Sequence, residues 1–452
     1  MRKVLFIAYY FPPMGGPGTQ RSAKFVKYLP EFGWEPIVVT ARREDYEVAR
    51  EFQLDSDLDA EMRDIRVRVH QVSGGRGVRL AAWAKGKGLF PFLWFLDYRD
   101  FWEPQVFWAR RAAARCLEIA RAERIDAVYT SMGPFSSALA GREVKLRASI
   151  PWVADLRDLW TEGELRVWPS RLHYEWEKRL ERRLLSAADG ILANTELSRV
   201  RLLENVGVPP ERVRVIPNGF DAGDFEGMTR ERGREQFVIA HVGAFRDHTK
   251  GPGQPRWPLY APVVGDERAR SPLYVLEAVR GLLADHPRIG EKLRIRLVGY
   301  LSPKNGELVE EMGLGEIVQA TGYLEHAAGV REIMNADALL LVLGVFADAR
   351  RAVPLVPGKV YEYLAGGKPI LAALPPGDAK RIVEESGAGF LAPHNDPEKI
   401  RETIERMYGM WEKGALDAAP RKEFVARFER RRQAGDLARF LDERVRGREG
   451  RQ

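Results

Sequence analysis

The stretch Val356-Pro-Gly-Lys-Val-Tyr-Glu-Tyr-Leu-Ala-Gly-Gly-Lys-Pro-Ile-Leu371 indicates the fold most directly. Its spacing predicts a short amphipathic helix that begins near Gly358, ends at Gly366-Gly367 and is followed by a β-strand. Lys359 lies in the first turn of this helix, and Glu362 follows on the same face. A cation near a helix N-terminus suits a diphosphate, and a nearby carboxylate suits ribose hydroxyl groups. The stretch therefore predicts a nucleotide-sugar site on an α/β unit.

Apolar, β-branched runs alternate with helical periodicity along the whole chain. The predicted strands form two series, 3–8, 36–40, 127–130, 152–154, 190–193 and 213–216, then 237–242, 293–298, 317–321, 338–343, 369–373 and 389–392. Such alternation predicts an α/β protein with two doubly wound parallel sheets. The polar segment 221–236 between the two series is expected to be a linker. Ligands of such folds bind beyond the carboxyl ends of the strands.

Composition restricts the cellular location and the partners. The chain has 452 residues, is 45% hydrophobic and contains one cysteine, Cys116. An internal disulfide is therefore excluded, and a cytoplasmic location is expected. The net charge of +7 suits anionic ligands, but 64 acidic residues are interspersed with the basic ones. No basic block indicates nucleic acid, which is not expected as a partner.

Two segments of the sequence could indicate targeting to a membrane or contact with one. The apolar segment 3–8 runs into prolines without a clear cleavage site, so we expect a buried first strand there. Aromatic side chains crowd residues 83–108, and arginine and lysine residues precede them. Such a segment suits peripheral contact with the inner face of a membrane and a lipid-linked acceptor. A packed insertion over the N-terminal sheet is the alternative.

The stretch at 356–371 resembles the donor-binding segment of GT-B glycosyltransferases, and specifically the large retaining family 4. The resemblance extends over nearly the whole chain. It implies two Rossmann-like domains that face each other across a cleft. Residues 1–218 with a crossover helix at about 421–452 would form the acceptor side, and residues 219–420 would bind the nucleotide sugar. The alternative for the final helix is packing on its own domain.

A glycine-rich turn follows the first predicted strand. Gly15, Gly16 and Gly18 allow the backbone to approach a ligand closely, and a helix is expected to begin near Ser22. The spacing is not that of the dinucleotide fingerprint. It resembles the glycine loop of family 4, which lies beneath the donor diphosphate and beside the acceptor.

Charged residues follow the strand predicted at 152–154. The run Asp155-Leu-Arg157-Asp158 resembles a strand-end motif of family 4 members that act on glycan precursors. The resemblance implies that Arg157 and Asp158 face the acceptor or the transferred sugar. The alternative is a structural Asp–Arg pair. Of the two aspartates, Asp155 is the one expected to have a structural role.

The second series of strands contains the other candidates. Family 4 commonly supplies an arginine and a lysine after the strand that ends at Gly243. Arg246 and Lys250 are the nearest matches, but residues 251–266 look inserted, so Arg270 competes for the arginine role. Charge-assisted pairing favours arginine for phosphate, and the sequence does not choose between the two sites. Tyr323 ends a later strand, where the family binds the base.

One departure from the family concerns sugar recognition. Many members carry a Glu-x7-Glu motif whose second glutamate matches Glu362, and the first contacts the sugar. Pro354 occupies the first position here. The segment 357–363 resembles instead the Pro-Ser-Lys-x-x-Glu-Tyr pattern of a subgroup of sugar transferases. The identity of the donor sugar is therefore left open.

No metal site is predicted. The run Asp55-Ser-Asp57-Leu-Asp59 is interpreted as a solvated loop, and the histidines show no ligand spacing. Lysine, arginine and helix dipoles would then stabilise a departing diphosphate. No cofactor is expected besides the nucleoside-diphosphate sugar as co-substrate.

The sequence thus predicts a metal-independent, retaining glycosyltransferase that moves a sugar from a nucleoside-diphosphate sugar to a hydroxyl acceptor. The alternatives are a nucleotide-sugar epimerase on the same fold and a non-catalytic nucleotide-sugar-binding subunit. The predicted catalytic residues are Asp158 and Arg157. The predicted donor-binding residues are Gly15, Gly16, Gly18, Gly243, Arg246, Lys250, Arg270, Tyr323, Gly358, Lys359 and Glu362.

Overall fold

The chain folds into two compact units. The first contains Met1–Asn218, Pro255–Ala261 and Arg430–Gln452, and the second contains Gly219–Gln254 and Pro262–Glu429. The structure is a computed structural model that describes residues 1–49, 55–75, 83, 103, 105–163, 166–231, 233, 235–249, 259–261, 267–344, 352–417 and 419–449. Each unit has its own apolar core on both faces of a central sheet.

Seven parallel strands in the order β3-β2-β1-β4-β5-β6-β7 form the sheet of the first unit. These are β1 (Arg2–Ala8), β2 (Trp34–Ala41), β3 (Arg68–Val72), β4 (Ala127–Met132), β5 (Trp152–Leu156), β6 (Gly190–Ala193) and β7 (Val213–Val215). β4 and β5 are buried throughout, as expected for strands covered by helices on both faces. The strand order changes direction between β1 and β4, which is where ligands of such sheets bind.

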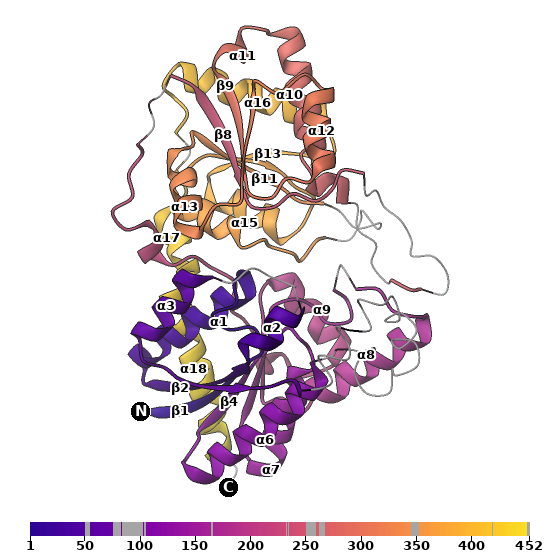
Figure 1. Cartoon of the computed structure of the whole chain (residues 1–452), viewed down its shortest axis with the longest axis vertical. Coiled ribbons are helices and arrows are strands. Elements are labelled where there is room, and N and C mark those ends of the chain that lie inside the picture. Colours follow the sequence, from indigo (N-terminus) through magenta and orange to yellow (C-terminus); the bar gives the residue numbers. More distant parts are fainter. Residues whose placement is uncertain are drawn as a thin grey trace. The chain divides into compact units, whose positions relative to one another are not determined.

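Helices cover both faces of this sheet (Figure 1). One face packs against α6 (Val106–Ala122), α7 (Ser137–Ala148), α8 (Arg171–Leu185) and α9 (Glu196–Val206). The other packs against α1 (Pro17–Tyr28), α3 (Ser56–Asp64) and α18 (Arg430–Glu449). The shorter elements are α2 (Arg43–Ala49), η1 (Leu29–Phe32) and η2 (Pro210–Arg212). Alternate residues of β1 join the two cores, Leu5 and Ile7 on one face and Val4 and Phe6 on the other.

Six parallel strands in the order β10-β9-β8-β11-β12-β13 form the sheet of the second unit. These are β8 (Phe237–Val242), β9 (Leu293–Val298), β10 (Val318–Gly322), β11 (Ala338–Val342), β12 (Ile370–Ala373) and β13 (Gly389–Ala392). The order changes direction between β8 and β11. The carboxyl ends of these two strands are therefore the expected ligand position in the second unit.

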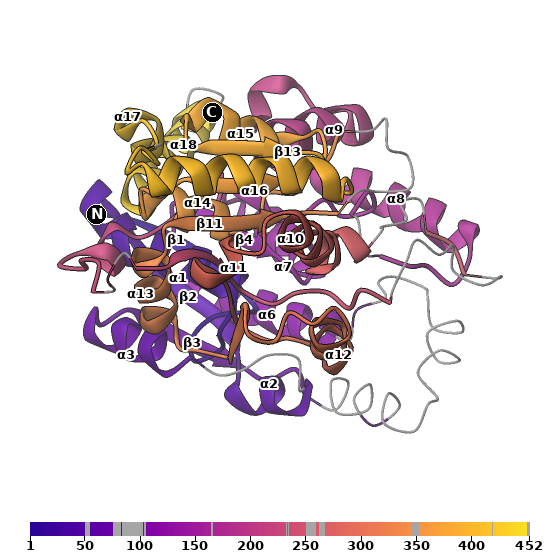
Figure 2. The same ribbon diagram turned by 90° about the horizontal axis from the view of Figure 1, so that it is seen from above.

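The second sheet is also covered on both faces. One face packs against α10 (Leu273–Asp285), α12 (Pro303–Glu311) and α16 (Pro397–Glu412), and α10 lies alongside α16 (Figure 2). The other packs against α13 (His326–Asn335), α14 (Lys359–Ala365), α15 (Asp378–Ser386) and α17 (Lys422–Val425). The remaining short elements are α11 (Ile289–Lys292), η3 (Ala222–Phe225), η4 (Glu267–Arg270) and η5 (Ala426–Phe428). The prediction of two doubly wound parallel sheets is confirmed.

Two local predictions were wrong. The acidic run at 55–59 is not a loop: Asp55 caps α3 by accepting a hydrogen bond from the Leu58 backbone N–H group at 3.0 Å. The tail is not one continuous helix, because the backbone is extended at Glu429. Phe424 before this break joins the core of the second unit, and Phe440 after it joins that of the first.

Cys116 lies on α6, in the interior of the first unit. Its side chain is fully buried in the core against which α6 packs, and burial raises the pKa of the thiol. Among the described residues, none of the helices combines the length and the apolar composition that crossing a bilayer requires.

α8 places an acidic side chain in the interior of the first unit. The Glu181 carboxylate is 1% exposed and accepts hydrogen bonds from the Thr161 hydroxyl group and, at 2.7 Å, from the Asn205 amide. Burial raises the pKa of Glu181 to about 7, although these two hydrogen bonds oppose the shift. The negative charges of Glu162 and Glu177 add to it. This carboxyl group therefore titrates near neutrality.

We predict that Glu181→Gln stabilises the protein in a pH-dependent way. Since the folded pKa of about 7 lies above the ordinary value, the parent loses stability as the pH rises from about 4.5 to about 7. Glutamine does not ionise, so the variant should gain about 3 kcal/mol relative to the parent above that range. Urea unfolding at about pH 5 and about pH 8 measures this difference. The control is Glu204→Gln at an exposed position of α9, and an equal effect of Glu181→Gln at both pH values would contradict the prediction.

Candidate functional site

The glycine loop of the first unit lies at the carboxyl end of β1. Gly16 has a φ of 104°, and its carbonyl group accepts a hydrogen bond from the Thr19 backbone N–H group at 3.0 Å. The Thr19 hydroxyl group donates to the carbonyl oxygen of Gly15 at 3.3 Å. The helix begins at Pro17, earlier than the predicted start near Ser22, because proline fits the first turn of a helix. The end of the glycine loop therefore forms the first turn of α1.

Arg157 lies against this loop. Its guanidinium group donates to the carbonyl oxygen of Gly133 at 2.9 Å and lies 5.8 Å from the centre of the Tyr10 ring. A Cβ atom on Gly18 would lie 1.3 Å from Nη1 of Arg157, so a larger residue would displace the arginine. The structure therefore brings Gly15, Gly16, Gly18 and Arg157 together at the point where the first sheet changes strand order.

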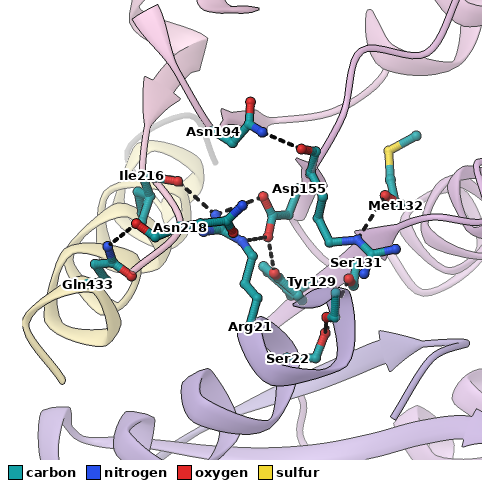
Figure 3. Close-up of polar contacts among 12 residues, drawn as sticks. Arg21, Ser22, Tyr129, Ser131, Met132, Asp155, Asn194, Ile216, Asn218 and Gln433 are labelled. Carbon is teal, nitrogen blue, oxygen red and sulfur yellow. Dashed lines mark hydrogen bonds and ion pairs between the residues drawn. The ribbon is translucent and has the colours of Figure 1, made fainter. Parts of the chain in front are cut away.

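Asp158 follows Arg157, and its side chain reaches solvent. The surrounding protein still raises the pKa of Asp158 by desolvation, and the positive charge of Arg157 opposes this shift. The Asn194 amide donates to the backbone carbonyl oxygen of Arg157, which ties this segment to the end of β6 (Figure 3). A carboxylate at the surface beside a cation can orient a hydroxyl group. This is the chemistry that the sequence predicts for these two residues.

Arg21 fixes the position of α1 beneath the loop. Its guanidinium group is fully buried and pairs with both carboxylate oxygens of Asp155, at 2.7 and 3.0 Å (Figure 3). It also donates to the backbone carbonyl oxygens of Ile216 and Pro217, at 2.9 and 2.7 Å. The Tyr129 hydroxyl group donates to the same carboxylate. Asp155 thus has the structural role that the sequence predicts.

Three glycines end neighbouring strands of the second unit. Gly243, Gly299 and Gly322 follow or end β8, β9 and β10, and their φ angles are 128°, 127° and 73°. A Cβ atom on Gly299 would lie 2.7 Å from the carbonyl oxygen of Gly243. The Gly299 backbone N–H group donates to Gly322 at 2.9 Å. Such backbone angles and contacts favour glycine at these strand ends.

Lys359 extends from α14 across Gly243. A Cβ atom on Gly243 would lie 2.5 Å from Nζ of Lys359, so glycine at this position leaves the space that the lysine fills. Nζ lies 2.9 Å from Nε2 of His241. From the next turn of α14, the Tyr363 hydroxyl group accepts a hydrogen bond from the Val242 backbone N–H group at 2.8 Å. α14 is thus fastened to the carboxyl end of β8 by two side chains.

The charge of Lys359 depends on its surroundings. Burial lowers the pKa of Lys359 to about 7, the Glu362 carboxylate raises it, and the positive charge of Arg270 lowers it. Burial and the neighbouring Lys359 hold the pKa of His241 well below its ordinary value. A lysine that titrates near neutrality will gain a proton when an anion binds beside it.

The structure separates the competing cations. The Arg246 backbone N–H group donates to the carbonyl oxygen of Arg270 at 3.0 Å, so the two segments lie side by side. Arg270 is partly buried and acts on the pKa of Lys359, whereas the Arg246 side chain is exposed. Lys250 lies outside the described residues. Of the competing arginines, Arg270 has the placement that favours pairing with a phosphate next to Lys359.

Gly358 and Glu362 complete the predicted segment. α14 has only seven residues, and the Val360 and Tyr361 backbone N–H groups donate to carbonyl oxygens of the preceding turn. The charge of Lys359, and not the helix dipole, is therefore the principal attraction for an anion here. Apart from the neighbouring residues of the chain, no described atom lies within 4 Å of a Cβ atom built on Gly358. Glu362 is partly exposed on the same helix.

Exposed aromatic rings follow the same edge of the sheet. Tyr300 and Tyr323 are 61% and 64% exposed and come directly after Gly299 and Gly322. Exposed rings at this edge can stack on a nucleobase. Pro354, which occupies the position of the family's sugar-contacting glutamate, is buried.

Sequence reasoning missed two residues of this region. His241 was not assigned a role, because a lone histidine in an apolar strand usually indicates packing. Asn305 of α12 is fully buried, and its amide donates to the Arg246 carbonyl oxygen at 2.8 Å while its oxygen accepts from the His248 backbone N–H group at 3.1 Å. No local signal in the sequence links Asn305 to the loop after β8. Across the part of the chain that the structure describes, histidine, cysteine, aspartate and glutamate side chains form no group of three that could hold a metal ion.

Comparison with known proteins identifies both halves of the chain. Residues 15–219 match the family model described as glycosyl transferase 4-like domain. Residues 265–409 match the model described as glycosyl transferases group 1. Together these two matches include most of both compact units.

The chain is similar to D-inositol 3-phosphate glycosyltransferases. That of Nocardioides is 25% identical over 235 residues, which are 50% of this chain and 47% of the relative. That of Geodermatophilus obscurus is 26% identical over 235 residues, which are 48% of this chain and 45% of the relative. The match therefore spans about half the length of these curated relatives.

Solved structures share the fold over nearly the whole chain. Anabaena HepE in complex with UDP has a TM-score of 0.62 at 17% identity, with 98% of this chain and 100% of that chain covered. A glycosyltransferase from Rickettsia africae has a TM-score of 0.63 at 14% identity, with 98% of each chain covered. With two parallel-sheet units and both family matches, the chain belongs to the group 1 glycosyltransferases with a 4-like N-terminal domain, and its fold is GT-B.

Proposed function

We propose that this protein transfers a sugar from a nucleoside-diphosphate sugar to a hydroxyl acceptor. The observation that supports this most strongly is the cationic site at the end of β8, where Lys359 crosses Gly243 and Arg270 acts on its pKa. Similar proteins named as glycosyltransferases support the reaction class. HepE, of the same fold, was solved with UDP and with UDP-glucose, which supports a nucleotide-sugar donor.

Each part of the donor has a matching group in the second unit. Lys359 and Arg270 would pair with the diphosphate, since cations form strong charge-assisted hydrogen bonds with phosphate. Glu362 would accept hydrogen bonds from the ribose hydroxyl groups, and Tyr300 or Tyr323 would stack on the base. In the first unit, Arg157 and Asp158 would orient the acceptor beside the glycine loop.

The same cations bear on the chemistry of transfer. Negative charge develops on the diphosphate as the bond to the sugar breaks, and cations already in place stabilise that charge. We therefore propose that transfer proceeds without a metal ion. Retention of the anomeric configuration is proposed from the family resemblance. Buried Pro354 removes a carboxylate from the sugar-contacting position, so sugar specificity would depend on other groups.

Lys359→Ala and Glu362→Ala should weaken nucleotide binding. A hydrogen bond to a charged group contributes about 1.5–3 kcal/mol, so loss of Lys359 should reduce the affinity for UDP by roughly 10- to 100-fold. Glu362→Ala should have the smaller effect, because it contacts neutral hydroxyl groups. Thermal unfolding with increasing UDP reports both losses as smaller ligand-induced shifts. The control is Lys413→Ala at an exposed position after α16; if all three variants respond like the parent, the proposed diphosphate site is wrong.

Turnover distinguishes the three candidate activities. A glycosyltransferase should release nucleoside diphosphate at a rate that depends on a hydroxyl acceptor, and a chelator should leave this rate unchanged. An epimerase would consume donor without acceptor, and a binding subunit would bind donor without turnover across donors and acceptors. Chromatography of nucleotides and sugars measures all three. Loss of turnover after chelation, restored by a divalent cation, would contradict the metal-independent reaction.

We also propose contact with an anionic membrane surface through α8. The aromatic segment that predicts membrane contact lies largely outside the described residues, and Trp108 within it is buried in the core. On α8, by contrast, Leu172 is 82% exposed and Trp176, one turn later, is 52% exposed. Arg179 and Arg183 continue this exposed face. Apolar side chains flanked by arginine suit the interface of a membrane with anionic lipids.

Vesicle sedimentation tests this surface. The parent should sediment with phosphatidylglycerol vesicles and much less with phosphatidylcholine vesicles, and the double variant Leu172→Ser/Trp176→Ser should lose most of this binding. Exposed apolar side chains on other elements provide the control, Leu146→Ser/Val69→Ser. Equal binding of the two double variants would contradict the assignment of α8.

A further inference from the structure

The hydrogen bonds of His241 define its tautomer. Nδ1 lies 3.0 Å from the backbone carbonyl oxygen of Leu340, which can only accept, so Nδ1 carries the proton. β8 and β11 are neighbouring strands, and this bond joins them at the point where the strand order changes direction. Nε2 therefore has a lone pair directed away from β11, and it lies 2.9 Å from Nζ of Lys359.

The imidazole ring has little freedom to move. It is 1% exposed and stacks on the Phe245 ring, with 3.9 Å between ring centres and 21° between planes. A second proton on His241 would place a buried cation next to Lys359, which is unfavourable. The ring therefore acts as a fixed, neutral acceptor, and the lysine is the donor.

Burial has the largest effect on the pKa of Lys359, and three neighbouring groups of the described structure also act on the lysine. Glu362 lies on the same helix and attracts the ammonium group, while the positive charge of Arg270 from η4 disfavours it. His241 on β8 is the third, and it is the only one of them with a hydrogen bond to Nζ. Without His241, none of these three groups would hold Nζ over Gly243 by a hydrogen bond.

We propose that His241 is the positioning residue for Lys359: its neutral imidazole accepts a hydrogen bond from the ammonium group and holds it over Gly243 for the diphosphate of the donor. This inference rests on the proposed function, because it assumes that the donor diphosphate binds at Lys359. Because a second proton on the buried His241 ring is unfavourable, the hydrogen bond to Nε2 favours the protonated form of Lys359. His241 would thus increase the fraction of molecules in which the site is ready to bind an anion.

The test compares two substitutions of the histidine. His241→Phe keeps an aromatic ring for the stack on Phe245 but removes the acceptor. His241→Gln places an amide oxygen near the position of Nε2 and can restore it. The matched control, Phe245→Leu, loses the stacking but keeps the hydrogen bond. All three variants change the same packed region, so a general loss of packing would affect them alike.

Two measurements are made on each protein. NMR of ¹³C-labelled lysine, with the Lys359 signal assigned from Lys359→Arg, gives the pKa of Lys359 without any nucleotide. Calorimetry gives the affinity for UDP at several pH values. His241→Phe should lower the pKa of Lys359 by about one unit and weaken UDP binding about fivefold near pH 7, with the loss approaching about tenfold as the pH rises. His241→Gln and Phe245→Leu should stay within about threefold of the parent.

The two measurements separate this inference from the proposed function. If the parent or Lys359→Ala shows that UDP does not bind at Lys359, the proposed function fails, while the lysine pKa in His241→Phe still reports on the hydrogen bond. If UDP binds at Lys359 and His241→Phe leaves both the pKa and the affinity unchanged, the positioning role is wrong. Equal losses in His241→Phe and Phe245→Leu would also overturn it, because packing alone would then explain them.

Discussion

The buried pair between Arg21 and Asp155 is the interaction on which the candidate site of the first unit depends. A guanidinium group without water around it needs a full set of acceptors, and loss of one partner from such a pair typically costs about 3–5 kcal/mol. Here Asp155 at the end of β5 and two carbonyl oxygens after β7 supply them. α1 is thereby held against two distant parts of the chain, β5 and the segment after β7. The glycine loop and Arg157 occupy a defined position because their supporting helix cannot shift without exposing this charge.

In the second unit, glycines at the strand ends position the candidate site, because they leave room for Lys359. Positive φ angles and close backbone contacts at the ends of β8 and β9 favour glycine, and the space over Gly243 is filled by Lys359 from another element. Burial and a neighbouring arginine then hold the lysine pKa near 7, so Lys359 is only partly charged near neutral pH until an anion binds. A diphosphate that binds here supplies the negative charge that stabilises the protonated form of Lys359. In the proposed role, the His241 hydrogen bond both holds Nζ of Lys359 over Gly243 and favours its protonated form.

The sequence predicted the features that depend on local pattern. Alternating apolar runs predict both sheets, and the spacing of Lys359 between glycines predicts a cation at the start of a helix. Contacts between distant segments were not predictable in this way. A backbone hydrogen bond joins Arg246 to Arg270, which is distant in sequence, and Asn305 supports the same loop from another helix. The break at Glu429 escaped detection because no glycine or proline marks it in the sequence, although Phe424 and Phe440 on either side of it belong to different cores. In the sequence His241 looks like a core histidine, because its hydrogen-bond partner Lys359 lies far away in the chain, on α14.

Proton uptake on nucleotide binding tests the central claim, that a nearly neutral Lys359 becomes charged when it pairs with a diphosphate. Calorimetric titration of UDP at about pH 8, in two buffers with different ionisation enthalpies, counts the protons that accompany binding. With a pKa of about 7 in the unbound protein, Lys359 should take up close to one proton per UDP, and Lys359→Arg should take up none. Binding of UDP to the parent without proton uptake would contradict the account.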